Sequence, residues 1–370
     1  MNVAQISELL NDVTPMALGE EAVSVVDLSS LVALGNVVLK SNESTDLWLK
    51  TLTLRIGKTI LSWRKYRNKL EDMVLDDFEY GAILQKISIH LIPAQDDPSA
   101  ELTDGETVDH YKINNPDVEQ KLFCSQTPYM FVVTIQDAWL NEAFLSFEKM
   151  GAFISYVFGR VRDSIEFSLE NLGRMCLCNF AVETENVVNL VSLYNAETGE
   201  TLDENTCLHS SKFLAFAVAI MNEYSDKLTD MSTTYNDGSM ERHTPYEDQR
   251  FRTLSTFRRR LETVVQYEAF HDNFVTPDRK ADYLRTLNYW QGEKSPMKIV
   301  VKRASDGEEV TINNVIAMLY DREALGIYKK TEKVVNTPIN AFGLFYNQAV
   351  HEKQLWFNDL SENYILFTLN

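Results

Sequence analysis

The sequence predicts an α+β fold, because helical and strand-like segments follow one another without the regular strand, helix, strand alternation of an α/β protein. Two observations indicate this most clearly. Residues 142–178 form one long amphipathic helical pattern, and residues 83–91 and 129–135 form strand patterns on either side of an acidic segment. With 370 residues, 45% of them apolar and 24% charged, the chain is long enough to bury a sizeable core.

The N-terminal segment mixes short apolar runs with polar residues. Residues 1–44 are compatible with an extended arm or with a folded element, and residues 45–63 predict a short helix followed by a strand. From Ile83 to Leu91 apolar and polar residues alternate with period two, which is typical of a half-exposed strand.

An acidic segment interrupts the strand pattern. Residues 93–119 are rich in Pro, Asp, Gly and Asn and hold eight acidic residues against Lys112 alone, so they contribute little to a core. Strand character resumes at residues 121–124 and 129–135. In the second of these runs one face carries Phe131, Val133 and Ile135. Because an isolated two-stranded ribbon is marginal in water, we expect this ribbon to rest on another surface.

The long helix is the most regular element of the sequence. Between Phe147 and Cys176 apolar residues recur at intervals of three and four, with charged residues on the opposing side. Thirty residues of α-helix measure about 45 Å, well beyond the usual helix of a globular domain. We expect Phe144 and Phe147 to begin its buried face.

The C-terminal half alternates between short elements. Its segments predict a strand at 186–194, a helix at 210–231, a loop at 233–248, a hairpin turning at 305–307, a second hairpin at 315–330 and a final strand at 364–369.

The formal net charge of −19 argues against a sequence-specific DNA reader, whose domain is normally basic. Residues 55–69 hold six bases and no acid, and residues 250–260 hold five arginines and no acid. Separated blocks of opposite sign suit a subunit that docks on copies of itself, although solvated faces of a monomer explain the charge equally well. The candidates for contacts between copies are Asp96, Asp97, Glu101, Asp104, Glu106, Asp109, Arg250, Arg252, Arg258, Arg259 and Arg260.

No catalytic residues, cofactor site or metal site are predicted. The chain contains no G-x-S-x-G, P-loop or G-x-G-x-x-G motif, and its six histidines are scattered. Cys176-x-Cys178 and Cys207-x-His209 could supply four zinc ligands, but residues two apart on a helix point about 200° away from each other, which favours buried thiols. An enzyme with an unrecognised site stays an alternative.

Nothing in the sequence predicts export or membrane insertion. The longest apolar run, Phe213 to Met221, is far shorter than the roughly 20 residues that span a bilayer. The first basic residue is Lys40, so the basic start of a secretory signal is missing and we expect a soluble cytoplasmic product.

The order of elements resembles the Hong Kong 97-type (Johnson) fold of tailed-bacteriophage major capsid proteins, within it those of the small phi twenty-nine-type podoviruses. Three segments carry the resemblance: "RIGKTI" (55–60), "DVEQKLFCSQTPYMFVVTIQDAWLNEAFLSFEKMGAFIS" (117–155) and "AMLYDREALGIYKKTEKVV" (317–335). The resemblance implies a major capsid protein that assembles into an icosahedral head shell around double-stranded DNA. An encapsulin-like cellular compartment is the alternative within the same fold.

The resemblance also implies a division of the chain and a set of partners. The parts would be an N-terminal arm (1–75), an E-loop that reaches over an adjacent subunit (76–136), a P-domain (137–206) with its spine helix at 142–178, an A-domain (207–335) and a return to the P-domain (336–370). The partners would be copies of the chain in pentamers and hexamers, a separate scaffolding protein, a portal and packaged DNA. The basic stretch 63–69 interleaves aromatic and basic residues, a pattern compatible with weak phosphate contact on the inner face through Arg64, Lys65, Arg67 and Lys69.

Overall fold

The computed structural model describes residues 3–19, 23–56, 66–75, 84–95, 97, 103–105, 107–109, 111, 113–124, 126–238, 240–268, 284–303 and 306–370. The chain forms two compact units. Unit 1 consists of Met1–Glu79, Gln126–Gly173 and Ile327–Leu355, and unit 2 consists of Tyr80–Ser125, Arg174–Gly326 and Trp356–Asn370.

Unit 1 begins with three helices, α1 (Val3–Leu18), α2 (Leu28–Val38) and α3 (Asn42–Ile56). The side chain of Asp27 accepts a hydrogen bond from the backbone N–H of Ser30, and the Ser30 hydroxyl accepts one from the N–H of Asp27, so a capping box fixes the start of α2. The N-terminal segment is therefore a folded element rather than an extended arm. The helix expected within residues 45–63 is confirmed up to Ile56, and residues 57–65, where a strand was expected, lie outside the described residues.

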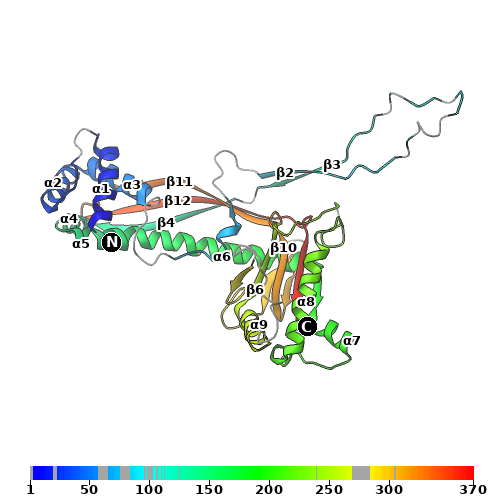
Figure 1. Cartoon of the computed structure of the whole chain (residues 1–370). Coiled ribbons are helices and arrows are strands. Elements are labelled where there is room, and N and C mark those ends of the chain that lie inside the picture. Colours follow the sequence, from blue (N-terminus) through cyan, green and yellow to red (C-terminus); the bar gives the residue numbers. More distant parts are fainter. Residues whose placement is uncertain are drawn as a thin grey trace. The chain divides into compact units, whose positions relative to one another are not determined.

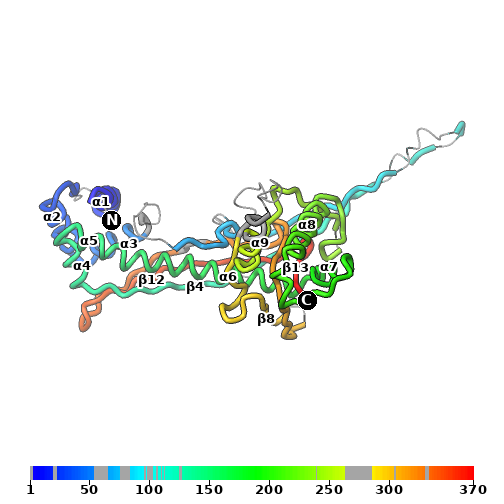
Figure 2. The backbone as a smooth tube through the Cα atoms, turned by 60° about the horizontal axis from the view of Figure 1, so that its bottom comes forward, coloured from blue at the N-terminus to red at the C-terminus, as the bar shows by residue number. Residues whose placement is uncertain are grey.

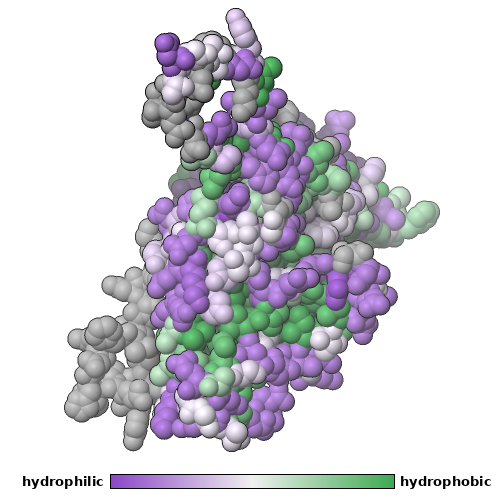
Figure 3. All heavy atoms as spheres, turned by 90° about the vertical axis from the view of Figure 1, so that its right-hand side faces the viewer, coloured by the Kyte–Doolittle hydropathy of each residue, from purple (hydrophilic) through white to green (hydrophobic). Residues whose placement is uncertain are grey.

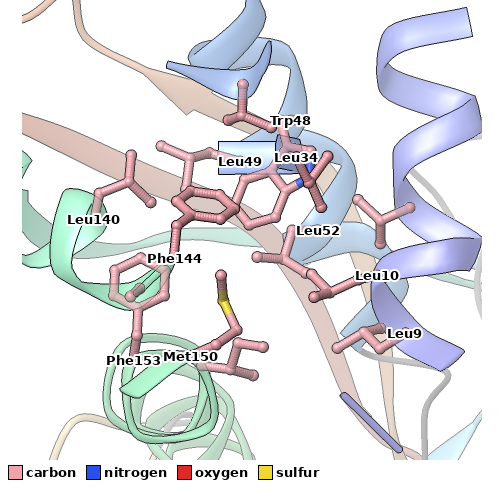
Figure 4. Packing of buried hydrophobic residues seen from close by; sticks show 14 of the residues in the cluster. Leu9, Leu10, Leu34, Trp48, Leu49, Leu52, Leu140, Phe144, Met150 and Phe153 are labelled. Carbon is pink, nitrogen blue, oxygen red and sulfur yellow. The ribbon is translucent and has the colours of Figure 1, made fainter. Parts of the chain in front are cut away.

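The three helices bury their apolar faces against α4 (Asp137–Ala143) and α5 (Phe147–Ile154), as Figure 4 shows. Trp48 of α3 lies at the centre of this core, with its ring centroid 5.3 Å from that of Phe144. A Cβ atom on Gly35 would lie only 2.7 Å from the Cβ of Phe144, so glycine lets α2 approach this ring closely. The expectation that Phe144 and Phe147 begin the buried face of the long helix is confirmed for Phe147, which packs against the cluster as the first residue of α5. It is wrong for Phe144, which is buried but ends α4.

A four-stranded sheet completes unit 1. Its strands are β1 (Val74–Leu75), β11 (Leu325–Asn336), β12 (Phe345–Asn358) and β4 (Gln126–Gln136), in that order across the sheet. Strand β4 pairs antiparallel with β12 from Gln136↔Phe345 to Gln126↔Leu355. As expected, Ile135 is buried and Phe131 and Val133 lie on the same inward face. Strands β4 and β12 run side by side (Figures 1 and 2).

The long helix is confirmed in substance, but its ends differ from 142–178. The chain leaves α4 at Phe144, and Ser146 then caps α5 by accepting a hydrogen bond from the N–H of Lys149. A π-helical turn, Ser155–Gly159, joins α5 to α6 (Arg160–Glu183). The helical path therefore starts at Phe147 and continues five residues beyond residue 178.

Unit 2 is built on a five-stranded sheet with the order β5, β13, β10, β6, β7. Central strand β10 (Val315–Asp321) pairs antiparallel with β13 (Tyr364–Thr368) and β6 (Gln249–Leu254). The edge strands are β5 (Val187–Asn189) and β7 (Leu284–Leu287). Helices α7 (Leu190–Thr198), α8 (Ser211–Lys227) and α9 (Ser255–Glu268) accompany this sheet, and β8 (Ile299–Lys302) and β9 (Glu309–Ile312) form a hairpin. All of β10 and β13 is buried, which explains their continuous apolar sequences.

Two expected elements of unit 2 are wrong. Residues 186–194 do not form one strand: β5 ends at Asn189, whose side chain accepts a hydrogen bond from the N–H of Ser192 and starts α7. Residues 315–330 do not form a hairpin, because β10 and β11 belong to different sheets. The final strand is confirmed, and the helix expected at 210–231 is confirmed from Ser211 to Lys227. The hairpin expected to turn at 305–307 is confirmed by the pairing of β8 with β9 and by the φ of +75° at Gly307, while Ser305 lies outside the described residues.

The surface is mainly hydrophilic on the face shown in Figure 3, but a band of hydrophobic side chains reaches the surface in its lower half. Among the described residues, no helix combines the length and the apolar character that a bilayer span requires.

Candidate assembly interface

A two-stranded ribbon in unit 2 is the first candidate for contact with other molecules. Strands β2 (Leu84–Ile89) and β3 (Val118–Phe123) pair antiparallel from Leu84↔Phe123 to Ile89↔Val118 (Figure 1). Side chains alternate strictly between the two faces, as the period-two pattern predicts. Four of the six side chains on the sheltered face are polar and four of the six on the exposed face are apolar, the reverse of the usual arrangement on a single core. The sheltered face also carries Leu84 and Phe123, and the Phe123 ring centroid lies 5.3 Å from that of Phe357.

The sheltered face carries two lysines that enter a charge cluster whose central carboxylates, Asp359 and Glu362, are buried. We define the charge cluster as Lys86 and Lys121 of the ribbon together with Arg242, Asp237, Glu323, Asp359 and Glu362. The Lys86 ammonium lies 2.5 Å from a carboxylate oxygen of Glu362 and 2.9 Å from one of Asp359. Lys121 lies 3.2 Å from the other oxygen of Asp359.

Arg242 binds both the ribbon and the body of unit 2. Its guanidinium lies 3.2 Å from Glu362 and donates a 2.7 Å hydrogen bond to the hydroxyl of Ser88 on β2. The side chain of Asp359 is fully buried and that of Glu362 is 5% exposed, so these pairs are shielded from solvent screening. The cluster therefore anchors the base of the ribbon to the body of unit 2.

The protonation of the cluster follows from burial and charge. Burial alone would raise the pKa of Asp359, but the neighbouring Lys86 and Lys121 ammoniums lower it below its ordinary value. Burial opposes the charge of Lys86, yet Asp359 and Glu362 raise its pKa above the ordinary value. Burial raises the pKa of Glu362 despite its two cationic neighbours. Lys86 and Asp359 are thus a charged pair at neutral pH.

The opposite face of the ribbon lies in water. We call it the apolar ribbon face; it consists of Ile87, Ile89, Val118 and Leu122, which are 60%, 61%, 50% and 57% exposed. Ile89 and Val118 are directly opposite each other in the register, and Leu122 lies further along the same face. Because the lysines of the other face are held in the charge cluster, the ribbon cannot turn this apolar face onto its own unit.

The acidic candidates lie in the segment of the chain that connects β2 to β3. Asp97, Asp104 and Asp109 are exposed, and the carboxylate of Asp109 accepts a hydrogen bond from the N–H of Tyr111. The other three predicted acids, Asp96, Glu101 and Glu106, lie outside the described residues.

The five arginines of residues 250–260 lie in different environments. The prediction that Arg252 contacts another copy is wrong, because Arg252 is fully buried in β6, with its guanidinium 5.5 Å from the centroid of the Tyr320 ring. Arg250 binds the carbonyl oxygens of Glu247 and Gln249. Arg258 pairs with Glu262 at 2.9 Å, Arg259 is exposed, and Arg260 reaches the carbonyl oxygen of Leu208.

The basic block of unit 1 is described only in part, because Arg64 and Lys65 lie outside the described residues. The hydroxyl of Tyr66 donates a 2.6 Å hydrogen bond to the buried carboxylate of Glu170, which also accepts from the backbone N–H of Lys69. These bonds fix the segment on α6. The side chain of Arg67 is 79% exposed and pairs with Glu71 at 2.8 Å.

Burial raises the pKa of Cys176 and of Cys178 to about 12, so both thiols are protonated at neutral pH. The part of the chain that the structure describes holds no cluster of three potential metal ligands.

Sequence reasoning missed the charge cluster. Lys86, Lys121, Arg242 and Asp359 are far apart in the chain, and each one alone resembles an ordinary surface residue. One local signal was available: Lys86 and Ser88 alternate with Ile87 and Ile89, and Lys121 alternates with Leu122.

Comparison with known proteins identifies the family. A model of the Phi29-like phage major capsid protein matches residues 8–368. The capsid structure of Staphylococcus phage Andhra is similar with a TM-score of 0.55 and 12% identity, covering 84% of this chain and 87% of that chain. The capsid structure of the Cyanophage P-SCSP1u is similar with a TM-score of 0.50 and 13% identity, covering 84% and 90%. No curated protein matches the sequence.

These likenesses confirm the Hong Kong 97-type fold that the order of elements implied. They do not favour the encapsulin-like alternative. The match over nearly the whole length shows that the chain belongs to the Phi29-like phage major capsid protein family, whose members build the head shell of the virion.

Proposed function

We propose that the ribbon is the element by which one subunit of the shell holds the next. The observation that supports this is the orientation of β2 and β3. The charge cluster holds the lysines of the sheltered face, and the apolar ribbon face is exposed to solvent. Apolar patches of this kind mark interaction surfaces. A neighbouring copy that covers the patch would gain affinity from apolar burial, while the cluster sets the direction of the ribbon.

The double substitution Ile87→Gln with Leu122→Gln is expected to lower the yield of shells by about tenfold, because it removes apolar contact area without adding charge. Shells are counted by sedimentation and electron microscopy, with and without a scaffolding protein. Val26→Gln, at an apolar residue of unit 1 that is 79% exposed, is the control. Normal shells from the double variant, with an unchanged melting temperature, would contradict the proposal.

We also propose that the acidic tip between β2 and β3 pairs with basic residues of a neighbouring copy, among them Arg258 and Arg259. Exposed ion pairs contribute only about 0 to 1 kcal/mol each and are screened by salt. Deletion of residues 96–109 is therefore expected to slow assembly at low salt and to have little effect at high salt. Assembly that is the same at every salt concentration would exclude this role.

We propose a weak, sequence-independent contact between packaged double-stranded DNA and the basic block that includes Arg67 and Lys69. Arg67 is well exposed, although Glu71 shares its charge. Arg67→Glu is expected to reduce the amount of DNA packaged while shells still form. The measurement is the DNA content of purified particles, with Lys149→Glu as the control at another exposed basic residue that pairs with an acid. Full packaging by the Arg67 variant would count against the contact.

The remaining parts of the proposal concern assembly as a whole. The chain would act without enzymatic activity or cofactor and would form pentamers and hexamers in the host cytoplasm. A separate scaffolding protein and a portal would complete the head. The five-part division into N-terminal arm, E-loop, P-domain, A-domain and return segment stays a prediction.

A further inference from the structure

Three aspartates of the chain are followed directly by glycine, the neighbour beside which an aspartate most readily rearranges its own backbone. The pairs are Asp104-Gly105, Asp237-Gly238 and Asp306-Gly307. In this rearrangement the backbone nitrogen of the glycine attacks the side-chain carboxyl carbon of the aspartate, and glycine favours the attack because it has no Cβ to crowd the nitrogen. Reaction at a given pair therefore depends on what holds its nitrogen and its carboxyl group in the folded chain.

The structure holds both reacting groups of Asp237-Gly238. The N–H of Gly238 donates a 2.7 Å hydrogen bond to the side-chain oxygen of Asn236, so the nitrogen that would attack is engaged. The N–H of Asp237 donates to the carbonyl oxygen of Leu360, which fixes the backbone at this point. The carboxylate of Asp237 lies 3.6 Å from the Lys121 ammonium in the charge cluster. This pair is thus kept out of the reactive arrangement.

The pair Asp306-Gly307 is held in the same way at the turn of the β8–β9 hairpin. The N–H of Gly307 donates a 2.9 Å hydrogen bond to the carbonyl oxygen of Arg303. One carboxylate oxygen of Asp306 accepts a 2.9 Å hydrogen bond from the N–H of Glu308, and the other lies 3.3 Å from the Arg303 guanidinium. Neither the nitrogen nor the carboxylate can move without breaking one of these contacts.

The pair Asp104-Gly105 differs from the other two. Both residues are exposed in the acidic segment that connects β2 to β3. Neither of them makes a hydrogen bond or an ion pair with another residue that the structure describes. Gly105 has φ +95°, and a Cβ atom placed on it would meet no atom within 4 Å, so the space beside the nitrogen is open. Here the two reacting groups are unrestrained.

We propose that Asp104-Gly105 is the site at which this chain forms isoaspartate. The Gly105 nitrogen bonds to Cγ of Asp104 and loses its proton, a hydroxyl leaves Cγ, and one water is released as a succinimide ring closes. Hydrolysis takes up one water and opens the ring at either carbonyl. Opening at the main-chain carbonyl directs the backbone through the side chain of Asp104, which lengthens it by one methylene group.

This modification keeps the carboxylate, so it alters the length and path of the acidic tip and not its charge. It requires only water and the folded chain and no oxidant. It therefore goes beyond the shell-forming function and does not depend on it. Subunits would accumulate the change with age in the segment that we propose to pair with a neighbouring copy.

Water enriched in oxygen-18 tests the proposal in the unaltered protein, because each cycle of closure and hydrolysis adds one heavy oxygen atom to the aspartate. The three pairs lie on different tryptic peptides, so mass spectrometry after digestion in ordinary water compares them directly. After incubation at neutral pH, Asp104 is expected to carry about tenfold more heavy oxygen than Asp237 or Asp306, whose glycine nitrogens must first give up a hydrogen bond. Equal labelling of the three aspartates, or none at Asp104, would overturn the proposal.

Two variants check the assignment. Asp104→Glu is expected to lose the labelling at this position, because glutamate must close a larger ring that forms more slowly. Asp109→Glu, at another exposed acid of the same segment, should leave the labelling of Asp104 unchanged. A protein isoaspartyl methyltransferase, which methylates isoaspartate and not aspartate, gives a second measurement: the aged parent is expected to accept methyl groups and Asp104→Glu to lose most of this acceptance. Equal acceptance by the two proteins would place the isoaspartate elsewhere and contradict the proposal.

Discussion

Lys86→Met is expected to lower the free energy of unfolding of unit 2 by about 3 kcal/mol, because it removes one cationic partner of the buried Asp359 carboxylate. The loss stays at the lower end of the range for such pairs, since Lys121 and Arg242 still neutralise part of the cluster. Urea denaturation measures the change. Hydrogen exchange of the backbone amides of β2 and β3 should become faster, because their anchor is weakened.

The matched control is Lys212→Met. Lys212 belongs to the same unit and lies 3.4 Å from Glu200, but its side chain is 76% exposed. A surface pair of this kind contributes at most about 1 kcal/mol. Equal losses in the two variants would show that burial gives the Lys86 pair no special role. Unchanged hydrogen exchange in the ribbon would show that the cluster is not its anchor.

Trp48→Ala is expected to lower the free energy of unfolding of unit 1 by about 3 to 5 kcal/mol, the usual loss when a large aromatic side chain is removed from a core. Trp48 is fully buried, and its ring packs beside that of Phe144 where α3 meets α4 and α5. The measurement is urea denaturation, with limited proteolysis within residues 3–56 as a second readout, because detached helices would be cut first.

Trp139→Ala provides the comparison. Trp139 is half exposed on α4 of the same unit and meets the Tyr156 ring edge-on at 5.8 Å, so its loss should be about 1 kcal/mol. A small effect of Trp48→Ala, similar to that of Trp139→Ala, would mean that the N-terminal helices are a loosely attached arm after all.

Periodicity predicted the local elements well. The alternation of apolar and polar residues predicted β2 and the inward face of β4. Apolar residues at intervals of three and four predicted the long helical path that starts at Phe147. The Ser305-Asp306-Gly307 signal predicted the β8–β9 hairpin, in which Gly307 has a positive φ. These features depend on residues that are near one another in the chain.

Two elements were mispredicted for reasons that lie elsewhere in the fold. The apolar run after Asn186 reads as a strand, but the capping side chain of Asn189 favours a helix once Leu190 and Val191 can pack in the core of unit 2. The segment after Asp321 reads as a hairpin, yet β10 finds its partners in β6 and β13, which are distant in sequence.

The sequence by itself determined the α+β class, a strand followed by an acidic tip, the long helix and, through resemblance, the capsid family, because patterns of neighbouring residues encode these features. The expected return strand at 129–135 is wrong as part of the ribbon: β2 pairs with β3 (Val118–Phe123), whereas β4 pairs with β12 in another sheet. Tertiary structure decided which face of the ribbon is sheltered, that Arg252 is buried, and that Lys86 and Lys121 meet Asp359. Alternation specifies that a strand has two faces but not which face is covered. That choice depends on distant carboxylates, whose burial makes the pairing with the ribbon lysines favourable only in the folded unit.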